Sequence, residues 1–349
     1  MSVDAGTNRL ALHVIHEERN AAFSVHGGWQ LPEHYGDVAA EYQQLRSHAV
    51  AYDRSDRTRL MVSGTDAGVV LGAVFGEAAA ELEEGRALRA VALDSDGCIA
   101  DLVLIARTGG IAYVVMGEPG RGAGTLTRLH SATGPGYDVQ LEDRTASTCL
   151  IGIAGPAAAD VAARQLNEAL PARLPPLHAT PFEFHGFRAL AVRTSGLGED
   201  GFELMLAPQV GEHLLGLLGA AGVPLAGFAA QEIARIESGV PAFAPDLETG
   251  LTPAEADLTT ALGLPPTTPS RVLSALLFTG ADAPSTGTPA LAGETVVGQL
   301  RSSARSFALD AAVGNAVLDQ ERSQPGTEIT VGGEFALVAQ KPLYRRRKT

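Results

Sequence analysis

The amino-acid sequence predicts an α+β protein that ends in a separate all-β domain. Helix and strand signals alternate through the first two thirds of the chain. After about residue 260, short apolar strands are joined by connections rich in Pro, Gly and Thr. The length of 349 residues exceeds what one hydrophobic core usually holds. We therefore expect an α+β part over residues 1–268 and a β domain, a small barrel or jelly-roll-like sheet, over 269–349.

The composition excludes several classes of protein. No apolar run reaches the ~18 residues that span a bilayer, and the N-terminus lacks the basic start and long apolar core of a signal peptide. The net charge of −14 would repel phosphates, so we expect no nucleic-acid partner and no membrane association. Cys98 and Cys149 are too few for a disulfide framework or a metal quartet. We expect a cytoplasmic protein without a metal site.

The first part of the chain alternates amphipathic helices with strands. Val38, Tyr42, Leu45 and Val50 recur roughly along one helical face, and Asp66 precedes an apolar run as a helix cap does. A Thr-Gly-Gly sequence between two β-rich runs indicates a hairpin. The predicted segments are helices over 35–53 and 66–76 and strands over 58–64, 98–107 and 111–117.

The same alternation continues from residue 149 until the β domain begins. A Gly-Pro turn joins a strand to a helix, and a later helix ends at Gly239. The predicted segments here are strands over 149–154, 187–195 and 202–208 and helices over 157–170, 211–222 and 231–239. The predicted strands of the β domain are 271–278, 296–304, 315–319, 327–331 and 334–340.

One short segment, Gly196-Leu-Gly-Glu-Asp-Gly201, matches the G-x-G-x-x-G pattern of dinucleotide-binding turns. That turn requires a helix directly after it, because the helix amides bind the pyrophosphate. Here an alternating strand follows, and Glu199 and Asp200 would repel a diphosphate. Asp200-Gly201 between two alternating runs instead predicts a β-hairpin. We therefore reject the dinucleotide interpretation.

Glu203 stands between Phe202 and Leu204 on a strand that otherwise has the pattern of a buried one. A buried carboxylate must find hydrogen-bond donors, and a flat ring edge with an amide and an amine, such as that of a pterin, offers two in parallel. The alternative is a surface hairpin whose glycines serve only the turn geometry. Periodicity alone leaves both interpretations open.

Several blocks of the sequence resemble one known family in the same order along nearly the whole chain. "RTSGLGEDGFEL" is similar to the R-T-G-Y-T-G-E-D-G-Y-E segment of the glycine cleavage T-protein (aminomethyltransferase) family, and "GGWQLPEHYG" to its G-W-x-M-P-x-x-Y-G. "AYDRSDRTRLMVSG", "DSDGCIADLVLI" and "LIGIAGPAA" parallel further motifs, as does "ARIESGVPAFAPDLETGLTPAEADL". The chain thus resembles a divergent member of the superfamily that also contains YgfZ-type folate-binding proteins, whose K-G-C-Y-x-G-Q motif it lacks.

The resemblance implies a three-lobed fold around a central cavity that holds tetrahydrofolate, with two interleaved α+β domains over residues 1–268. It implies that Asp101 is the catalytic aspartate, that Glu203 grips the pterin edge, and that Arg235 and Tyr344 contact the cofactor. A carboxylate near a folate nitrogen can position the amine, relay its proton and stabilise developing positive charge. The alternatives are a turn-capping role for Asp101 and a surface salt bridge of Arg235, for instance with Glu232.

The sequence departs from the family pattern at three positions. Ile105 and Gly196 stand where the family has tyrosines that would line the cofactor, and Asp56 stands where it has a histidine. Each lost aromatic would weaken stacking on the cofactor by ~1 kcal/mol. We therefore predict a tetrahydrofolate-dependent transferase or demethylase acting on a small amine or methylated substrate. A non-catalytic folate-binding or regulatory protein, and an enzyme that uses the cavity for another substrate without folate, remain as alternatives. A carrier-protein partner also stays open, although no sequence feature indicates one.

The remaining polar features predict no site. His13 and His16 share one helical face in a segment that we expect to be solvated, so we expect no metal there. Trp29 and Tyr35 are expected to pack near the cavity mouth. The basic tail over 344–349 is the charge run of a solvated terminus, unless the last strand returns it to an anionic ligand.

Overall fold

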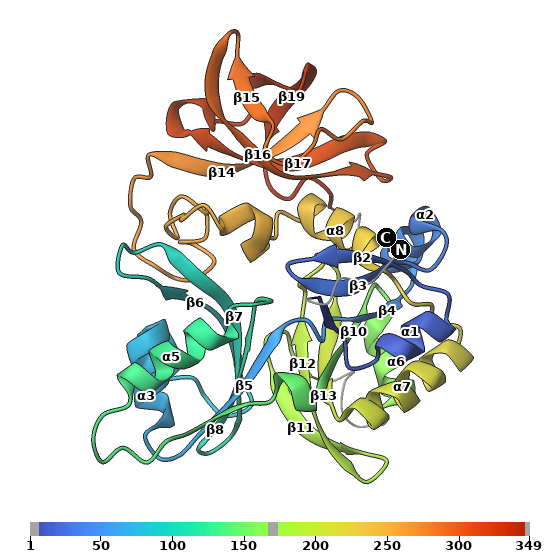
Figure 1. Cartoon of the computed structure of the whole chain (residues 1–349), viewed down its shortest axis with the longest axis vertical. Helices are drawn as coiled ribbons and strands as arrows, with labels where there is room; N and C mark the ends of the chain where they lie inside the picture. The colour runs from blue at the N-terminus through green and yellow to red at the C-terminus, as the bar shows by residue number, and fades with distance from the viewer. Residues whose placement is uncertain (1–6, 167–173, 346–349) are drawn as a thin grey trace. The chain divides into compact units, whose positions relative to one another are not determined.

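The computed structural model describes residues 7–166 and 174–345, and the described strands form four sheets (Figure 1). The chain divides into two compact units. The first comprises residues 1–93 and 100–230, and the second comprises residues 94–99 and 231–349. Our expected boundary at residue 268 lies inside the second unit and stays a prediction. No helix among the described residues is long and apolar enough to cross a membrane.

One five-stranded sheet of the first unit carries helices on one face (Figure 1). Its strands, in spatial order, are β6 (Ala87–Leu93), β7 (Ile99–Gly109), β8 (Ala112–Gly117), β5 (Thr58–Ser63) and β9 (Gln140–Asp143). The associated helices are α3 (Ala67–Phe75), α4 (Glu77–Ala80) and α5 (Gly122–Ala132). Leu71 of α3 and Leu129 of α5 pack against Leu60, Ile105 and other alternate residues of the strands, because alternation directs those side chains to one face.

The second five-stranded sheet packs against the first and has its own helices. Its strands, in spatial order, are β11 (Ala179–Phe184), β12 (Phe187–Thr194), β13 (Gly201–Leu206), β10 (Cys149–Ala154) and β4 (Val50–Asp53). The helices are α2 (Val38–Ser47), α6 (Ala158–Gln165) and α7 (Pro208–Ala220), and η1 spans Thr145–Ser147. Leu104 and Met116 of the first sheet share a core with Leu150 and Val192 of the second. The two sheets therefore meet face to face.

A smaller three-stranded sheet completes the first unit. It contains β1 (Asn8–Arg9), β3 (Trp29–His34) and β2 (Ala22–His26) in that order, and α1 spans His13–Glu18. The predicted hairpin over 98–117 is confirmed as antiparallel β7 and β8. The predicted helix over 35–53 is right for α2 but wrong at its end, because Val50 already belongs to β4.

The second unit contains the predicted β domain as a closed barrel. Its strands, in spatial order, are β14 (Arg271–Phe278), β17 (Ala311–Asp319), β16 (Thr295–Ser306), β15 (Pro289–Ala292), β18 (Glu328–Val331) and β19 (Glu334–Ala339). Also present are α8 (Phe228–Glu237), which begins in the first unit, η2 (Phe243–Leu247) and η3 (Gln320–Arg322). Leu276, Leu300 and Val338 are among the residues that fill the barrel interior.

Three local predictions are corrected by the structure. His13 and His16 are buried, with 5% and 0% of their surface exposed, because α1 packs these residues inward. Asp66 precedes α3 without capping it, since its carboxylate accepts from the Asp138 amide. The β12–β13 loop is longer than the predicted two-residue turn: only Gly198 within it has a positive φ, of 78°, and Asp200 pairs with Arg193.

Candidate functional site

Asp101 lies on β7, on the face directed toward the helices. Its carboxylate accepts hydrogen bonds from Thr125 Oγ1 of α5 at 2.6 Å and from the backbone amide of Glu118 at 2.9 Å. Asp101 is fully buried, and burial raises its pKa to about 6 even though both hydrogen bonds lower it. A carboxyl group whose pKa lies closer to neutral pH is better suited to act as a general acid or base.

Glu118 links Asp101 to Glu203 through one arginine. Arg57 Nη2 lies 2.8 Å from Glu118 Oε1, and Arg57 Nη1 lies 3.3 Å from Glu203 Oε1. Glu203 is on β13, on the face that meets the first sheet, with 5% of its surface exposed. Because burial makes an unpaired charge costly, this arginine stabilises both carboxylates. The candidate site is this series, in which Asp101, Glu118 and Glu203 are buried and Arg57 is half-buried.

Two atoms of this series have no hydrogen-bond partner within the part of the chain that the structure describes. They are Arg57 Nε, a donor, and Glu203 Oε2, an acceptor, and both are buried. Buried polar atoms without a partner are rare because each costs free energy. A ligand edge that offers a donor to Glu203 and an acceptor to Arg57 would satisfy both atoms. The edge of a pterin ring has this chemistry, so the residues present fit tetrahydrofolate.

Two further residues stand beside Glu203. The Tyr52 ring of β4 lies over Gly152, where a Cβ would come within 2.0 Å of the ring, and Gly152 is the register partner of both Tyr52 and Glu203. Arg89 of β6 donates to Thr194 Oγ1 at 3.1 Å, and burial lowers its pKa although the charge of Glu203 raises it. Burial, followed by the charge of Glu203, raises the pKa of Tyr52 well above its usual range. Tyr52 is therefore a neutral hydroxyl beside a charged cluster.

Arg235 lies in the second unit, in an ion-pair network. It forms a bidentate pair with Glu232 at 2.7 and 2.6 Å, and its Nη1 lies 2.6 Å from Asp246 Oδ2. Burial lowers the pKa of Arg235, but the charges of Asp246 and Glu232 outweigh burial and raise it. Asp246 is fully buried and also accepts from Ser302. The alternative salt bridge to Glu232 is therefore present, but Arg235 is buried rather than on the surface, and its predicted cofactor contact stays a prediction.

The other predicted cofactor residues lie in different surroundings. Ile105 is fully buried in the core beneath α3 and α5. Gly196 lies in the β12–β13 loop, where an added Cβ would meet nothing within 4 Å. Tyr344 belongs to the second unit and its amide donates to Glu237 O at 3.1 Å. Asp56, at the family's histidine position, is buried and pairs with Arg54 at 3.2 Å; burial raises its pKa.

Sequence reasoning missed the residues that connect Asp101 with Glu203. Arg57 lies within the quoted motif "AYDRSDRTRLMVSG", but nothing in its spacing showed that it reaches two carboxylates from distant strands. Glu118, Arg89 and Thr125 had no signal at all. A basic residue beside an apolar strand was the only available hint for Arg57. Among the residues that the structure describes, no group of His, Cys, Asp and Glu is arranged to hold a metal.

Comparison with known proteins covers nearly the whole chain. Residues 12–265 match the family model described as the GCVT N-terminal domain, and residues 271–344 match the glycine cleavage T-protein C-terminal barrel domain. A protein named aminomethyltransferase from Streptomyces avermitilis is 29% identical over 365 residues, covering 97% of this chain and 98% of the relative. One of the same name from Rubrobacter xylanophilus is 30% identical over 269 residues, covering 76% and 70%.

A solved structure shows the same fold. The glycine cleavage system aminomethyltransferase T from Bartonella henselae superposes with a TM-score of 0.88 at 24% identity, over 97% of this chain and 98% of that one. The two family models and the relatives named above place the chain in the aminomethyltransferase class. The chain belongs to the glycine cleavage T-protein family. The predicted resemblance, fold class and transferase type of enzyme are confirmed.

Proposed function

We propose that this chain is a tetrahydrofolate-dependent one-carbon transferase or demethylase that acts on a small amine or methylated substrate. The observation that carries the proposal is the buried Glu203 Oε2 without a hydrogen-bond partner, beside the equally unpartnered Arg57 Nε. This pair matches a planar ring edge that has a donor and an acceptor. The names of the relatives, all aminomethyltransferases, support the same class of reaction.

The proposed role of each site residue follows from its position in the cluster. Tetrahydrofolate, when bound, supplies the ring nitrogens that accept or release the one-carbon group. Glu203 and Arg57 would hold the ring edge, and Arg57 would balance the charge of Glu118 as well. Because the cluster is buried, these charges act with little solvent screening and keep their orientation.

Asp101 would hold the proton that the reaction moves. With its pKa at about 6, it is partly protonated just below neutral pH, and Thr125 and the Glu118 amide fix its two oxygens. As a carboxylate it also anchors the backbone of Glu118 and thereby positions the side chain that pairs with Arg57. Loss of the Asp101 charge is therefore expected to affect turnover more than folate binding.

Calorimetric titration with tetrahydrofolate and 5-formyltetrahydrofolate tests the folate site. We expect micromolar binding by the wild type, a loss of at least about tenfold in Glu203→Gln, and no change in Glu183→Gln. Glu183 is a suitable control because it is an exposed glutamate on β11 of the same sheet. Asp101→Asn should bind folate but not turn over methylated amines. Binding that is unaffected by Glu203→Gln would contradict the proposed site.

A second candidate is an enzyme of the same family that uses this cluster for another substrate without folate. Two observations favour it. Gly196 and Ile105 stand where the family has tyrosines, and Ile105 is buried in the hydrophobic core, so its side chain is not available to a cofactor. Absence of any folate binding by the folded wild type would support this candidate over the first.

A further inference from the structure

A buried hydrogen-bonded series lies on the other side of β4 from the candidate site. The Tyr35 hydroxyl lies 2.8 Å from His16 Nδ1, and His16 Nε2 lies 2.9 Å from Asp53 Oδ2. Asp53 follows Tyr52 on β4, so strand alternation directs it to the opposite face. Because the Asp53 carboxylate accepts, His16 donates to it from Nε2, which leaves Nδ1 to accept the hydrogen bond from the Tyr35 hydroxyl. The series fixes the Tyr35 ring in one position.

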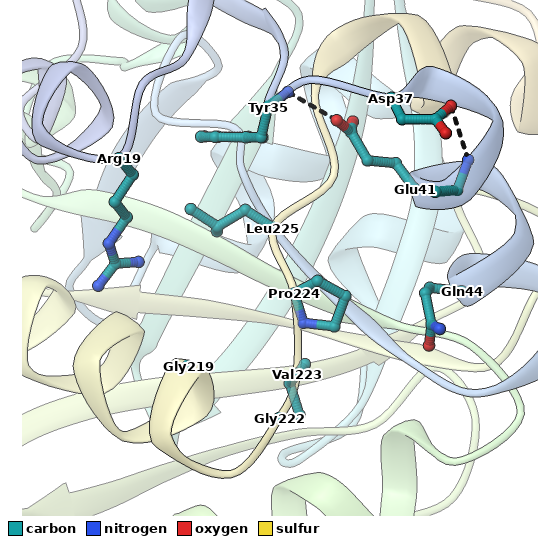
Figure 2. Close-up of a pocket in the computed structure, with 11 residues that line it drawn as sticks. Arg19, Tyr35, Asp37, Glu41, Gln44, Gly219, Gly222, Val223, Pro224 and Leu225 are labelled. Atoms are coloured by element: carbon teal, nitrogen blue, oxygen red, sulfur yellow. Dashed lines mark hydrogen bonds between the residues drawn. The ribbon is translucent and has the colours of Figure 1, made fainter.

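The fixed ring is part of the wall of an open pocket in the first unit (Figure 2). The pocket has a volume of about 620 Å³, within the range of small-molecule sites. Pro224 and Leu225 form the apolar part of the wall. Their backbone is held against β4, since the Ala51 amide donates to Pro224 O at 2.9 Å and the Ala226 amide donates to Ala51 O at 2.8 Å. We call this cavity the Tyr35 pocket.

The charged side chains around the Tyr35 pocket differ in whether they are already hydrogen-bonded within the protein. Glu41 is committed to the backbone, because its two oxygens accept from the amides of Tyr35 and Gly227 at 2.6 and 2.8 Å. Asp37 caps α2 but is exposed and keeps one oxygen free for solvent. Arg19 is the one cationic side chain among the lining residues. Within the described ranges its guanidinium has no hydrogen bond and no ion pair.

We propose that the Tyr35 pocket is a second binding site, for a small carboxylate with an apolar body and no second negative charge. The Arg19 guanidinium matches a carboxylate bidentately. The Tyr35 ring, Pro224 and Leu225 offer apolar surface to the rest of the molecule. Figure 2 shows Arg19 and Asp37 on different sides of the pocket, so a second carboxylate at the far end of a ligand would be repelled by Asp37. This site is separate from Glu203 and from folate chemistry.

Three six-carbon probes test the carboxylate contact and the exclusion of a second negative charge: hexanoate, hexanol and adipate. Ligand-observed NMR on the full-length protein measures their binding. We expect hexanoate to bind at least about tenfold more tightly than hexanol, because a hydrogen bond to a charged group adds that much. Adipate should bind more weakly than hexanoate because of Asp37. Equal binding of hexanol and hexanoate, or no binding of hexanoate, would overturn the proposal.

Matched variants test whether hexanoate binds at Arg19. Arg19→Gln should weaken hexanoate binding at least about tenfold, whereas Arg188→Gln, which changes an exposed arginine on β12, should leave it unchanged. Glu203→Gln should also leave hexanoate binding unchanged, which separates this site from the folate site. Equal losses in Arg19→Gln and Arg188→Gln would show only general charge attraction. Inorganic phosphate that binds as tightly as hexanoate would overturn the apolar part of the proposal.

Discussion

Gly117 lies directly against the carboxylate of Asp101: a Cβ added at Gly117 would sit 2.6 Å from Asp101 Oδ2. Asp101 cannot move away without losing its 2.6 Å hydrogen bond from Thr125. The carboxylate of Asp101 can therefore occupy its position only because residue 117 has no side chain. Residue 117 has to be small because of a contact between β7 and the end of β8.

Gly117→Ala is expected to destabilise the protein by ~1–3 kcal/mol, the usual cost of overpacking a buried site. It should also reduce turnover, because the displaced Asp101 loses its hydrogen bonds. Gly196→Ala is the control, since a Cβ there meets nothing within 4 Å and the change should stay within ~0.5 kcal/mol. Urea unfolding measures both. Equal stability of the two variants would contradict the contact.

Asp101→Asn is expected to gain stability relative to the wild type as the pH rises. The pKa of Asp101 goes from 3.8 for the ordinary group to about 6 in the fold, so the folded state prefers the protonated form. The wild type therefore loses stability between pH 4 and 6, by about 3 kcal/mol for roughly two pKa units. Asn cannot ionise and is spared this loss. A difference in unfolding free energy that does not change between pH 4 and 7 would contradict the shifted pKa.

Arg57→Gln is expected to cost ~3–5 kcal/mol, because it removes the guanidinium that pairs with the carboxylates of both Glu118 and Glu203. Arg188→Gln should cost less than ~0.5 kcal/mol. The double variant Arg57→Gln/Glu203→Gln should recover part of the loss, since one unpaired charge is removed with its partner. Denaturation of the wild type, of Arg57→Gln, of Glu203→Gln and of the double variant forms a double-mutant cycle. Strict additivity would mean that the two residues do not interact.

Arg235→Met is expected to lower the stability of the second unit by ~3–5 kcal/mol, because Asp246 is fully buried and loses its cation. Asp246→Asn in the same chain should restore part of the loss. Thermal unfolding followed by calorimetry measures the change. Unchanged unfolding together with weaker folate binding would instead assign Arg235 to the cofactor, as the family resemblance implies.

Gly196→Tyr is expected to strengthen tetrahydrofolate binding by ~1 kcal/mol, about fivefold, because it restores an aromatic ring where the loop has open space. Ile105→Tyr should fail to do so and should destabilise the protein by ~1–3 kcal/mol, since that position is in the core. Calorimetric titration with tetrahydrofolate and urea unfolding are the measurements. Unchanged folate binding by Gly196→Tyr would show that this loop does not approach the cofactor.

The α+β class, the all-β C-terminal domain and the family were predictable from the sequence alone, whereas the closure of that domain into a barrel was not. Periodicity in the strands and helices is a local property, and motif order is read directly from the chain. The motifs also predicted site roles for Asp101 and Glu203, which stay predictions, and the strand pattern placed Glu203 correctly on a buried strand.

The surroundings of those residues follow from contacts between distant parts of the chain. Arg57 reaches Glu118 and Glu203 across 61 and 146 positions of sequence, and no local pattern reports such a contact. The burial of His16 was missed for the same reason, since its partner Asp53 lies 37 residues away on a strand. Side-chain charge is visible in a sequence, but its burial and pairing depend on which strands meet, and those decide the free energy and the chemistry of each group.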